Sequence, residues 1–435
     1  MKLNLITVML LGSGLFLTAC GGSDDKGDNS STSTNVNADV NNIQNPVVNA
    51  PVPYVLEDYY DKEDYTVPNA AEGVVMTYKM QGIKGQETQA TALVFTPKTE
   101  PPAGGWPIVA WAHGTVGVAN KCAPSRNPLI VRGGLLEDLH TIKMIDNFVQ
   151  AGYVVVAPDY EGLGEPSAPG ETEDKEVHPL LNLKSEAYSI TDAVVATKNW
   201  LGNKASNKWA VTGVSQGGHA ALGAAQYAAR ANMNYKGAVA FAPANNLEMI
   251  EKLSDMALAN YTNVNAQMNG YAAVDTLTAY MAASMKSLYP TESVYSIVFK
   301  PPTDKVAAQA EKRCLADMVL ENIIRMTMYR NKNKGSLVGY PRKNEGYGQH
   351  PIVRQFLDKD SQPLQTLIKT PIIIYQGGKD LIVLPQATDA MVAQARALTT
   401  KIDYRTNPDW DHAGGFKANV DNGQLLEDIK TLLAN

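Results

Sequence analysis

The sequence predicts an α/β fold, in which a mostly parallel central sheet carries helices on both faces and an inserted helical cap. Five short runs are apolar at every position, as strands buried on both faces of a parallel sheet require. Segments with helical spacing, such as residues 185–201, separate these runs. One interval, residues 248–366, is far too long for an ordinary connection and has helical spacing of its own. The apolar runs are residues 108–111, 153–156, 209–211, 238–241 and 372–375.

Length and composition exclude several classes of protein. The chain has 435 residues, of which 44% are hydrophobic and 19% charged, so it can bury a large core and is not a disordered protein. Its formal net charge of −6 offers no basic field for nucleic acid, and we expect no DNA or RNA partner. Three cysteines exclude a disulfide-rich miniprotein. The motifs H-E-x-x-H and G-x-x-x-x-G-K are absent, so we expect neither a metal nor a cofactor.

The first 19 residues predict a signal peptide rather than part of the fold. Lys2 gives a positive start, residues 3–17 form an apolar run too short for a permanent span, and small residues precede Cys20. The pattern is similar to a bacterial lipoprotein signal, which implies cleavage before Cys20 and acylation of its thiol. Gly21 favours sorting to the outer membrane, so we expect an exported lipoprotein, anchored by its lipid at that membrane or the cell surface. The alternative is an ordinary secretory signal with a chance cysteine.

Residues 20–53 are predicted to be the acylated cysteine and a flexible tether. They are mostly Gly, Ser, Asp, Asn, Thr and Pro without an aromatic residue, and such a segment cannot bury enough apolar surface to order itself. The predicted core then comes in two parts, residues 54–247 and 367–435, with the helical cap at 248–366 between them. The alternative for that interval is a separate packed domain with no role at the site.

The core is expected to begin with an antiparallel pair, because apolar and polar residues alternate over residues 73–81 and 88–96. The five apolar runs then supply the parallel strands, and residues 401–405 supply the last one. Polar loops at the carboxyl ends of such strands are where sites of open α/β sheets form.

One of these loops carries a nucleophile motif. Residues 213–217, Gly-Val-Ser-Gln-Gly, match G-x-S-x-G between the run at 209–211 and an alanine-rich helix predicted at 220–230. A serine squeezed between a strand and a helix adopts a strained backbone, and its neighbours two positions away must be small. The sequence therefore predicts Ser215 as a catalytic nucleophile.

A serine nucleophile needs a histidine base that is oriented by a carboxylate, and in this type of fold the chain order is Ser, acid, His. His350 and His412 follow the serine motif, but His350 lies before the strand at 372–375, inside the predicted cap. His412 follows the last predicted strand in a glycine-containing loop, so we predict it as the base. Asp380, in the turn after residues 372–375, is the predicted orienting acid. The rivals near His412 in sequence are Asp403, Asp409 and Asp411.

The oxyanion of a tetrahedral intermediate requires two backbone N–H groups, one from the residue after the serine and one from a loop after an early strand. These requirements nominate the N–H groups of Gln216 and Thr115. His113 precedes the loop glycine, and we expect it to make a structural hydrogen bond beneath the loop.

A family resemblance rests on these segments. Residues 106–117 (WPIVAWAHGTVG), 122–125 (CAPS), 157–164 (APDYEGLG), 178–180 (HPL) and 215–219 (SQGGH) resemble the secretory lipase family of α/β-hydrolases. The resemblance implies an α/β-hydrolase fold and hydrolysis of carboxylic esters, as in a lipase or carboxylesterase, by a triad of Ser215, Asp380 and His412 under a helical cap. It implies an ester or lipid substrate without fixing its chain length.

Two other functions stay open at this stage. Related α/β-hydrolases cleave peptides, so a serine peptidase is the first alternative. A catalytically silent surface binding protein on the same scaffold is the second, although the sequence contains all three residues of the predicted triad.

The cysteines allow one further prediction. Once Cys20 is acylated, only Cys122 and Cys314 remain, and an exported protein meets an oxidising compartment. We predict a disulfide between them, which would tie the cap to the rim of the site. The alternative is two buried free cysteines that act as small apolar residues.

Overall fold

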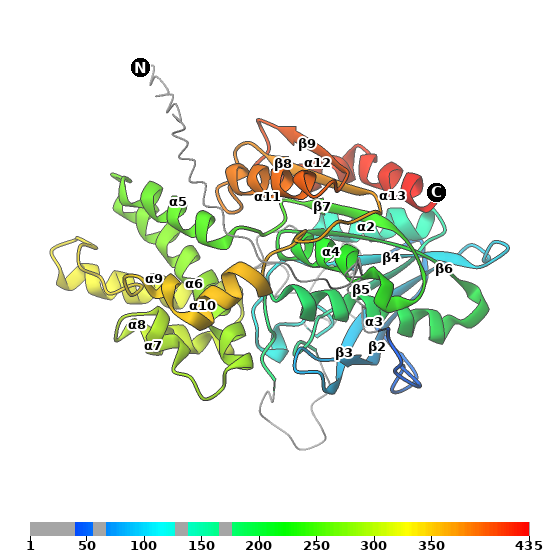
Figure 1. The fold of residues 1–435 in the computed structure, drawn as a ribbon, viewed down its shortest axis with the longest axis horizontal. Coiled ribbons are helices and arrows are strands. Elements are labelled where there is room, and N and C mark those ends of the chain that lie inside the picture. Colours follow the sequence, from blue (N-terminus) through cyan, green and yellow to red (C-terminus); the bar gives the residue numbers. More distant parts are fainter. Residues whose placement is uncertain (1–39, 55–66, 127–137, 165–175, 435) are drawn as a thin grey trace, which may run out of the picture. The chain divides into compact units, whose positions relative to one another are not determined.

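The computed structural model describes residues 40–54, 67–126, 138–164 and 176–434, which belong to one compact unit, Ala38–Asn435. The predicted signal peptide and Cys20 lie outside the described residues. A nine-stranded sheet in the order β1-β2-β3-β5-β4-β6-β7-β8-β9 forms the centre of this unit (Figure 1). The strands are β1 (Val52–Pro53), β2 (Ala70–Gln81), β3 (Glu87–Pro97), β4 (Trp106–Ala112), β5 (Val154–Pro158), β6 (Ala205–Val214), β7 (Asn234–Phe241), β8 (Ile372–Gly377) and β9 (Ile402–Asn407).

The sheet is mostly parallel, as predicted. Strands β4 to β9 pair in parallel with one another, whereas β1, β2 and β3 are joined by antiparallel pairing and β3 runs antiparallel to β5. Each apolar run identified in the sequence lies in one of the parallel strands, except that Tyr153 precedes β5 by one residue. The carboxyl ends of β6, β8 and β9 therefore open at the same edge of the sheet, and each is followed by a loop that carries a predicted site residue.

Helices cover both faces of the sheet. Alternate residues of a strand enter two different cores, since Ile108 and Ala110 belong to one apolar cluster and Val109 and Trp111 to another. The first cluster includes side chains of α3 (Leu183–Leu201), α4 (Gln216–Gln226) and α11 (Pro385–Ala397). The second includes side chains of α2 (Asp138–Gln150), α12 (Gly414–Asp421) and α13 (Gln424–Ala434). This double covering is why the strands are apolar at every position.

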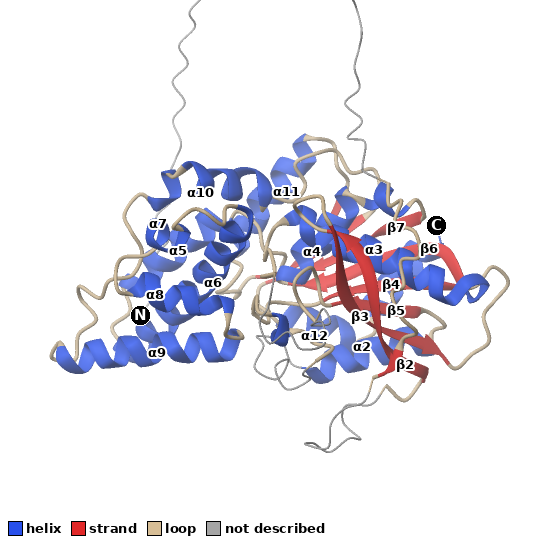
Figure 2. Ribbon diagram, turned by 90° about the horizontal axis from the view of Figure 1, so that it is seen from below, coloured by secondary structure: helices blue, strands red, loops and turns tan. Residues whose placement is uncertain are grey.

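The long interval between β7 and β8 is helical, and its helices gather to one side of the sheet (Figures 1 and 2). We call these the cap helices. An apolar cluster joins them to loops of the core, because it contains Val118, Leu181 and Val383 of the core together with Tyr280, Phe299 and other residues of the interval. The cap helices are α5 (Leu247–Ala259), α6 (Val264–Leu288), α7 (Val294–Val298), α8 (Thr303–Ala307), α9 (Leu315–Lys332) and α10 (Pro351–Gln355).

The amino-terminal boundary differs from the prediction. The predicted tether includes residues 40–53, but residues 46–53 lie along β2 and end in the short strand β1, and Asn41 donates to Asp192 and to the Arg230 carbonyl. The Val48 N–H donates to the Thr77 carbonyl, and the Lys79 N–H donates to the Pro46 carbonyl. The composition of this segment did not indicate these contacts, because they are hydrogen bonds between backbone atoms. Polar residues and prolines can also make such bonds, since every residue has a backbone carbonyl. None of the helices in the described part of the chain has the length and apolar character needed to cross a bilayer.

Candidate active site

Ser215 occupies a strained turn between the end of β6 and the start of α4. Its φ is +59°, a conformation rarely adopted by a residue with a side chain, and it is 7% exposed. The Ser215 N–H donates to the carbonyl of Phe241 at 2.9 Å, which fixes the turn to the neighbouring strand β7. The small neighbours are required, because a Cβ at Gly213 would lie 2.3 Å from the carbonyl oxygen of Gly217. The geometry is that of a nucleophile elbow.

Asp380 and His412 come together from the loops after β8 and β9. His412 Nδ1 lies 2.8 Å from Asp380 Oδ2, and both side chains are buried. The other carboxylate oxygen of Asp380 accepts the N–H groups of Ile382 and Val383 at 2.9 Å each, so the carboxylate cannot rotate away from the ring. Asp380 thereby fixes the orientation of the ring and leaves its other nitrogen without a contact to this carboxylate.

The second ring nitrogen, His412 Nε2, is buried and has no hydrogen-bond partner among the described residues. A buried unpaired ring nitrogen is costly to the fold and is typical of a functional site. The predicted rivals of Asp380 are engaged elsewhere. Asp403 pairs with Arg405, Asp409 pairs with Lys379, and Asp411 accepts the N–H of Gly414.

The alternative base, His350, lies in the cap interval, where it precedes α10. Its backbone N–H donates to the Tyr347 carbonyl, and no hydrogen bond to Asp380 is recorded among the described residues. Of these two candidate bases, His412 is therefore the one that contacts Asp380.

The predicted oxyanion donors lie on two elements that approach each other closely, since a Cβ at Gly217 would lie 1.9 Å from the carbonyl oxygen of Ala112 and 2.8 Å from that of His113. Gln216 is the first residue of α4, where the N–H groups lack an acceptor within the helix. Thr115 lies in the loop after β4. Beneath this loop His113 Nδ1 lies 2.7 Å from the carbonyl of Gly114, and burial lowers the pKa of His113. His113 is therefore in a structural position, as the sequence suggested.

The cap interval holds this loop in place. The Leu315 N–H donates to the Val116 carbonyl at 2.8 Å, and Gly117 forms an isolated β-bridge with Cys314. Cys314 is also joined to Cys122 by a disulfide with an S–S distance of 2.09 Å. The backbone next to Thr115 is thus tied to the start of α9.

A cluster of buried polar side chains around Gln216 was not predicted from the sequence. Its members are Gln216, His178, Glu186 and His219, all of them nearly or fully inaccessible to solvent. The sequence offered one signal, since His178, Gln216 and His219 lie in segments that carry the family resemblance, whereas Glu186 lies in none of them. Nothing in the sequence showed that the four residues meet. They come from a loop, α3 and α4, which only the fold brings together.

Burial shifts the pKa of several groups next to this cluster. It raises the pKa of the Asp159 carboxyl to about 6 and that of Glu161 to about 7, and hydrogen bonds from Ser125 and Ser185 respectively oppose the shifts. It lowers the pKa of His178 to about 3, so this ring is neutral at physiological pH.

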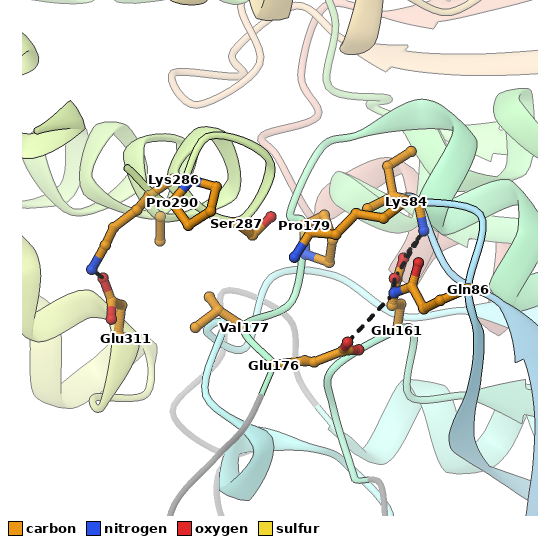
Figure 3. Close-up of a pocket in the computed structure, with 12 residues that line it drawn as sticks. Lys84, Gln86, Glu161, Glu176, Val177, Pro179, Lys286, Ser287, Pro290 and Glu311 are labelled. Atoms are coloured by element: carbon orange, nitrogen blue, oxygen red, sulfur yellow. Dashed lines mark hydrogen bonds and ion pairs between the residues drawn. The ribbon is translucent and has the colours of Figure 1, made fainter. Parts of the chain in front are cut away.

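A cavity of about 250 Å³ lies between the core and the cap helices (Figure 3). Its core side is formed by the β2–β3 hairpin and by residues 176–179, and its cap side by the end of α6. Figure 3 shows the Lys286–Glu311 ion pair across from Gln86 and Glu176. None of Ser215, Asp380 and His412 lines this cavity, so we do not assign it to the acyl group. The described residues contain no group of three or more His, Cys, Asp or Glu side chains that could hold a metal ion.

Comparisons with known proteins agree with this fold. A family described as serine aminopeptidase, S33 matches residues 129–407, which is more than half of the chain. The closed state of lipase A from Candida antarctica is similar at a TM-score of 0.62 and 18% identity, over 88% of this chain and 83% of that one. A variant of the rice cell wall degrading esterase LipA from Xanthomonas oryzae is similar at a TM-score of 0.58 and 20% identity, over 82% of this chain and 91% of that one. The search of curated proteins found no match.

Proposed function

The chain belongs to the family described as serine aminopeptidase, S33 and has an α/β-hydrolase fold, and we propose that it hydrolyses carboxylic esters, as a lipase or carboxylesterase. Ser215 is the nucleophile, His412 the general base and Asp380 the residue that orients the base. The N–H groups of Gln216 and Thr115 stabilise the oxyanion.

The observation that carries the proposal is the Asp380–His412 pair. The 2.8 Å contact holds Nδ1 of the ring, while the buried Nε2 has no partner among the described residues and can accept a proton. The pair lies on the loops after β8 and β9, at the sheet edge where the strained turn of Ser215 follows β6. Position and chemistry thus agree with a triad.

The reaction then proceeds in two halves. His412 Nε2 takes the proton of the Ser215 hydroxyl while Oγ bonds to the ester carbonyl carbon, and the carbonyl oxygen becomes the oxyanion. Collapse of this intermediate breaks the bond to the alcohol oxygen, which leaves with the proton from His412. Water next attacks the acyl-enzyme with His412 as base, and the carboxylic acid leaves while Ser215 regains its proton.

A serine peptidase is the second candidate, because the matching family is described as an aminopeptidase family. Such an enzyme needs an anionic group near the nucleophile to hold the ammonium of its substrate. Glu161 and Glu176 both line the cavity described above, but its lining contains no member of the proposed triad. The lipase and esterase neighbours in fold also support the ester substrate.

We further propose that the protein is an exported lipoprotein whose membrane contact is an acyl chain on Cys20. Support comes from the sequence pattern alone, in which a short apolar run and small residues precede the cysteine. The site would then act on ester or lipid substrates at the outer membrane or the cell surface.

The test is turnover of p-nitrophenyl esters with short and long acyl chains, measured beside peptide p-nitroanilides. We expect hydrolysis of the esters and loss of it in Ser215→Ala, which serves as the blank. Peptide turnover that exceeds ester turnover and depends on Ser215 would favour the peptidase. Ester turnover that survives Ser215→Ala would refute the proposal.

A further inference from the structure

We propose that Glu186 and His219 are positioning residues for the oxyanion hole, which act through the side-chain amide of Gln216. The inference rests on the proposed function, because it assigns to Gln216 the backbone N–H that meets the oxyanion. It extends that function by two residues which lie outside the triad and which no substrate can touch.

The amide of Gln216 is held from two sides. Its Nε2 lies 2.8 Å from Glu186 Oε1 and 2.8 Å from His178 Nε2, and the side chain is 1% exposed. His178 donates from Nδ1 to the Glu161 carbonyl at 2.9 Å, so its Nε2 is free to accept. Both amide hydrogens of Gln216 therefore have an acceptor.

The orientation of this amide is set by charge. Rotation of the amide by 180° would place its carbonyl oxygen against the Glu186 carboxylate, which would repel it. In the observed orientation Gln216 Oε1 is buried and has no partner among the described residues. The fold thus tolerates an unsatisfied carbonyl, a costly feature, to keep both hydrogens on their acceptors.

Glu186 is held in turn by His219. His219 Nδ1 lies 2.6 Å from Glu186 Oε2, and both side chains are 0% exposed. His219 Nε2 lies 3.1 Å from the carbonyl of Ser361, which can only accept, so Nε2 carries a hydrogen. One proton must then lie between Nδ1 and Oε2, on either atom, and the pair as a whole is neutral. A neutral pair can be buried without the penalty of a lone charge.

The result is a chain of contacts that crosses three parts of the molecule. Glu186 lies on α3, Gln216 and His219 lie on α4, and Ser361 follows the cap helices. Glu186 Oε1 also accepts the Leu181 N–H at 2.9 Å, in the segment that carries His178. Gln216 is adjacent to Ser215, so fixing its side chain also fixes the peptide group whose N–H faces the reacting carbonyl.

This arrangement predicts an effect on the chemical step rather than on substrate binding. An oxyanion donor forms its best hydrogen bond only in the transition state, so a displaced N–H lowers kcat and leaves KM nearly unchanged. A displacement of about 1 Å suffices to lower the rate by a large factor.

The first experiment replaces Gln216 by Met in the full chain, which removes the amide and keeps the backbone N–H and the side-chain length. We expect kcat for p-nitrophenyl esters to fall by roughly 10- to 100-fold with KM within about threefold. A trifluoromethyl ketone, whose adduct with serine carries an oxyanion, should lose affinity by a similar factor. The matched control is Asn322→Leu, which removes the buried amide that binds Thr276 between α6 and α9. It should lower Tm and leave kcat unchanged.

The second experiment compares two replacements of Glu186. Glu186→Ala removes the acceptor of the Gln216 amide, and we expect kcat to fall as in Gln216→Met. Glu186→Gln keeps an oxygen for Gln216 and an N–H for His219 Nδ1, and it should recover at least about tenfold of that loss. Each kcat is calculated per folded molecule, with the folded fraction of each variant measured by circular dichroism.

The proposal is overturned if Gln216→Met keeps kcat within about twofold of wild type, or if Glu186→Gln is as impaired as Glu186→Ala. Either result, with Ser215→Ala inactive, leaves the proposed function intact. Activity that survives Ser215→Ala is the separate failure of the proposed function itself.

Discussion

The carbonyl oxygen of Ala112 occupies the space that a side chain at Gly217 would need. A Cβ built on Gly217 lies 1.9 Å from that oxygen, well inside any tolerated contact. Ala112 ends β4 and Gly217 belongs to the first turn of α4, so the absence of a side chain allows the nucleophile helix to approach the strand before the oxyanion loop.

Gly217→Ala should therefore destabilise the protein by roughly 3 kcal/mol or more and lower ester turnover, because backbone atoms must move apart. The measurement is urea unfolding together with kcat. Gly348→Ala is the matched control, since its Cβ would meet nothing closer than 3.7 Å. Equal stability of the two variants would contradict the close approach.

The triad predicts the effect of removing each polar group. His412→Ala should lower kcat by about 10⁴-fold, and Asp380→Asn by a factor of about 10³ to 10⁴, because the amide no longer selects the correct ring tautomer. His350→Ala should keep nearly the full rate. A large loss in His350→Ala with little loss in His412→Ala would exchange their roles.

The buried neutral ring of His178 predicts a dependence of stability on pH. Burial lowers the pKa of His178 to about 3, whereas in the unfolded chain it is about 6.5. As the pH falls, the unfolded state therefore binds a proton at His178 before the folded state does. The contribution of the neutral ring to the free energy of unfolding is complete above about pH 6.5 and is lost as the pH falls towards 3. Between pH 7 and pH 5 this one group accounts for a loss of about 2 kcal/mol.

His178→Asn removes the titrating ring and keeps a donor for the Glu161 carbonyl. The free energy of unfolding of this variant should fall by about 2 kcal/mol less than that of wild type between pH 7 and pH 5. Urea titrations at both pH values measure the difference. An identical pH dependence of the two proteins would show that His178 is not buried as a neutral group.

The Cys122–Cys314 bond closes a separation of 192 residues in the sequence. In the chain-entropy model, Cys122→Ala with Cys314→Ala should lower the free energy of unfolding by up to about 5 kcal/mol. Mass spectrometry of an unreduced digest should find the two peptides linked. Two alkylatable thiols in the native exported protein would exclude the bond.

The predicted lipid anchor has a direct chemical test. Radioactive palmitate should label the wild-type protein and not Cys20→Ala, and the variant should move from the membrane fraction to the soluble periplasmic fraction. Equal labelling of the two proteins would mean that the amino-terminal pattern is not a lipoprotein signal.

The fold was predicted from local sequence patterns, and the prediction was correct for features that depend on a few neighbouring residues. Residues 372–375 are apolar at every position because β8 is covered on both faces, and the alternation over residues 73–81 reflects a strand with one face buried. Ser215 could be found because its strained turn imposes small residues at fixed offsets, which leaves a short readable motif.

The features that the sequence did not disclose depend on contacts between distant segments. Glu186 and His219 are 33 residues apart, and the second acceptor of the His219 ring is a backbone carbonyl, which has no sequence signature. Asp380 had three rivals by sequence, and the contacts that orient its carboxylate, with the N–H groups of Ile382 and Val383 and with His412, form only in the folded chain.

The short strand β1 and the residues before it bear on how the protein can be shortened for study. Residues 46–54 occupy hydrogen-bonding groups of β2, a strand of 12 residues. A protein shortened to begin at residue 55 would leave those groups open to pair with a second copy, and an open strand of this length promotes aggregation. One that begins at residue 40 keeps them covered, and it is the form in which we expect a monodisperse, refoldable enzyme.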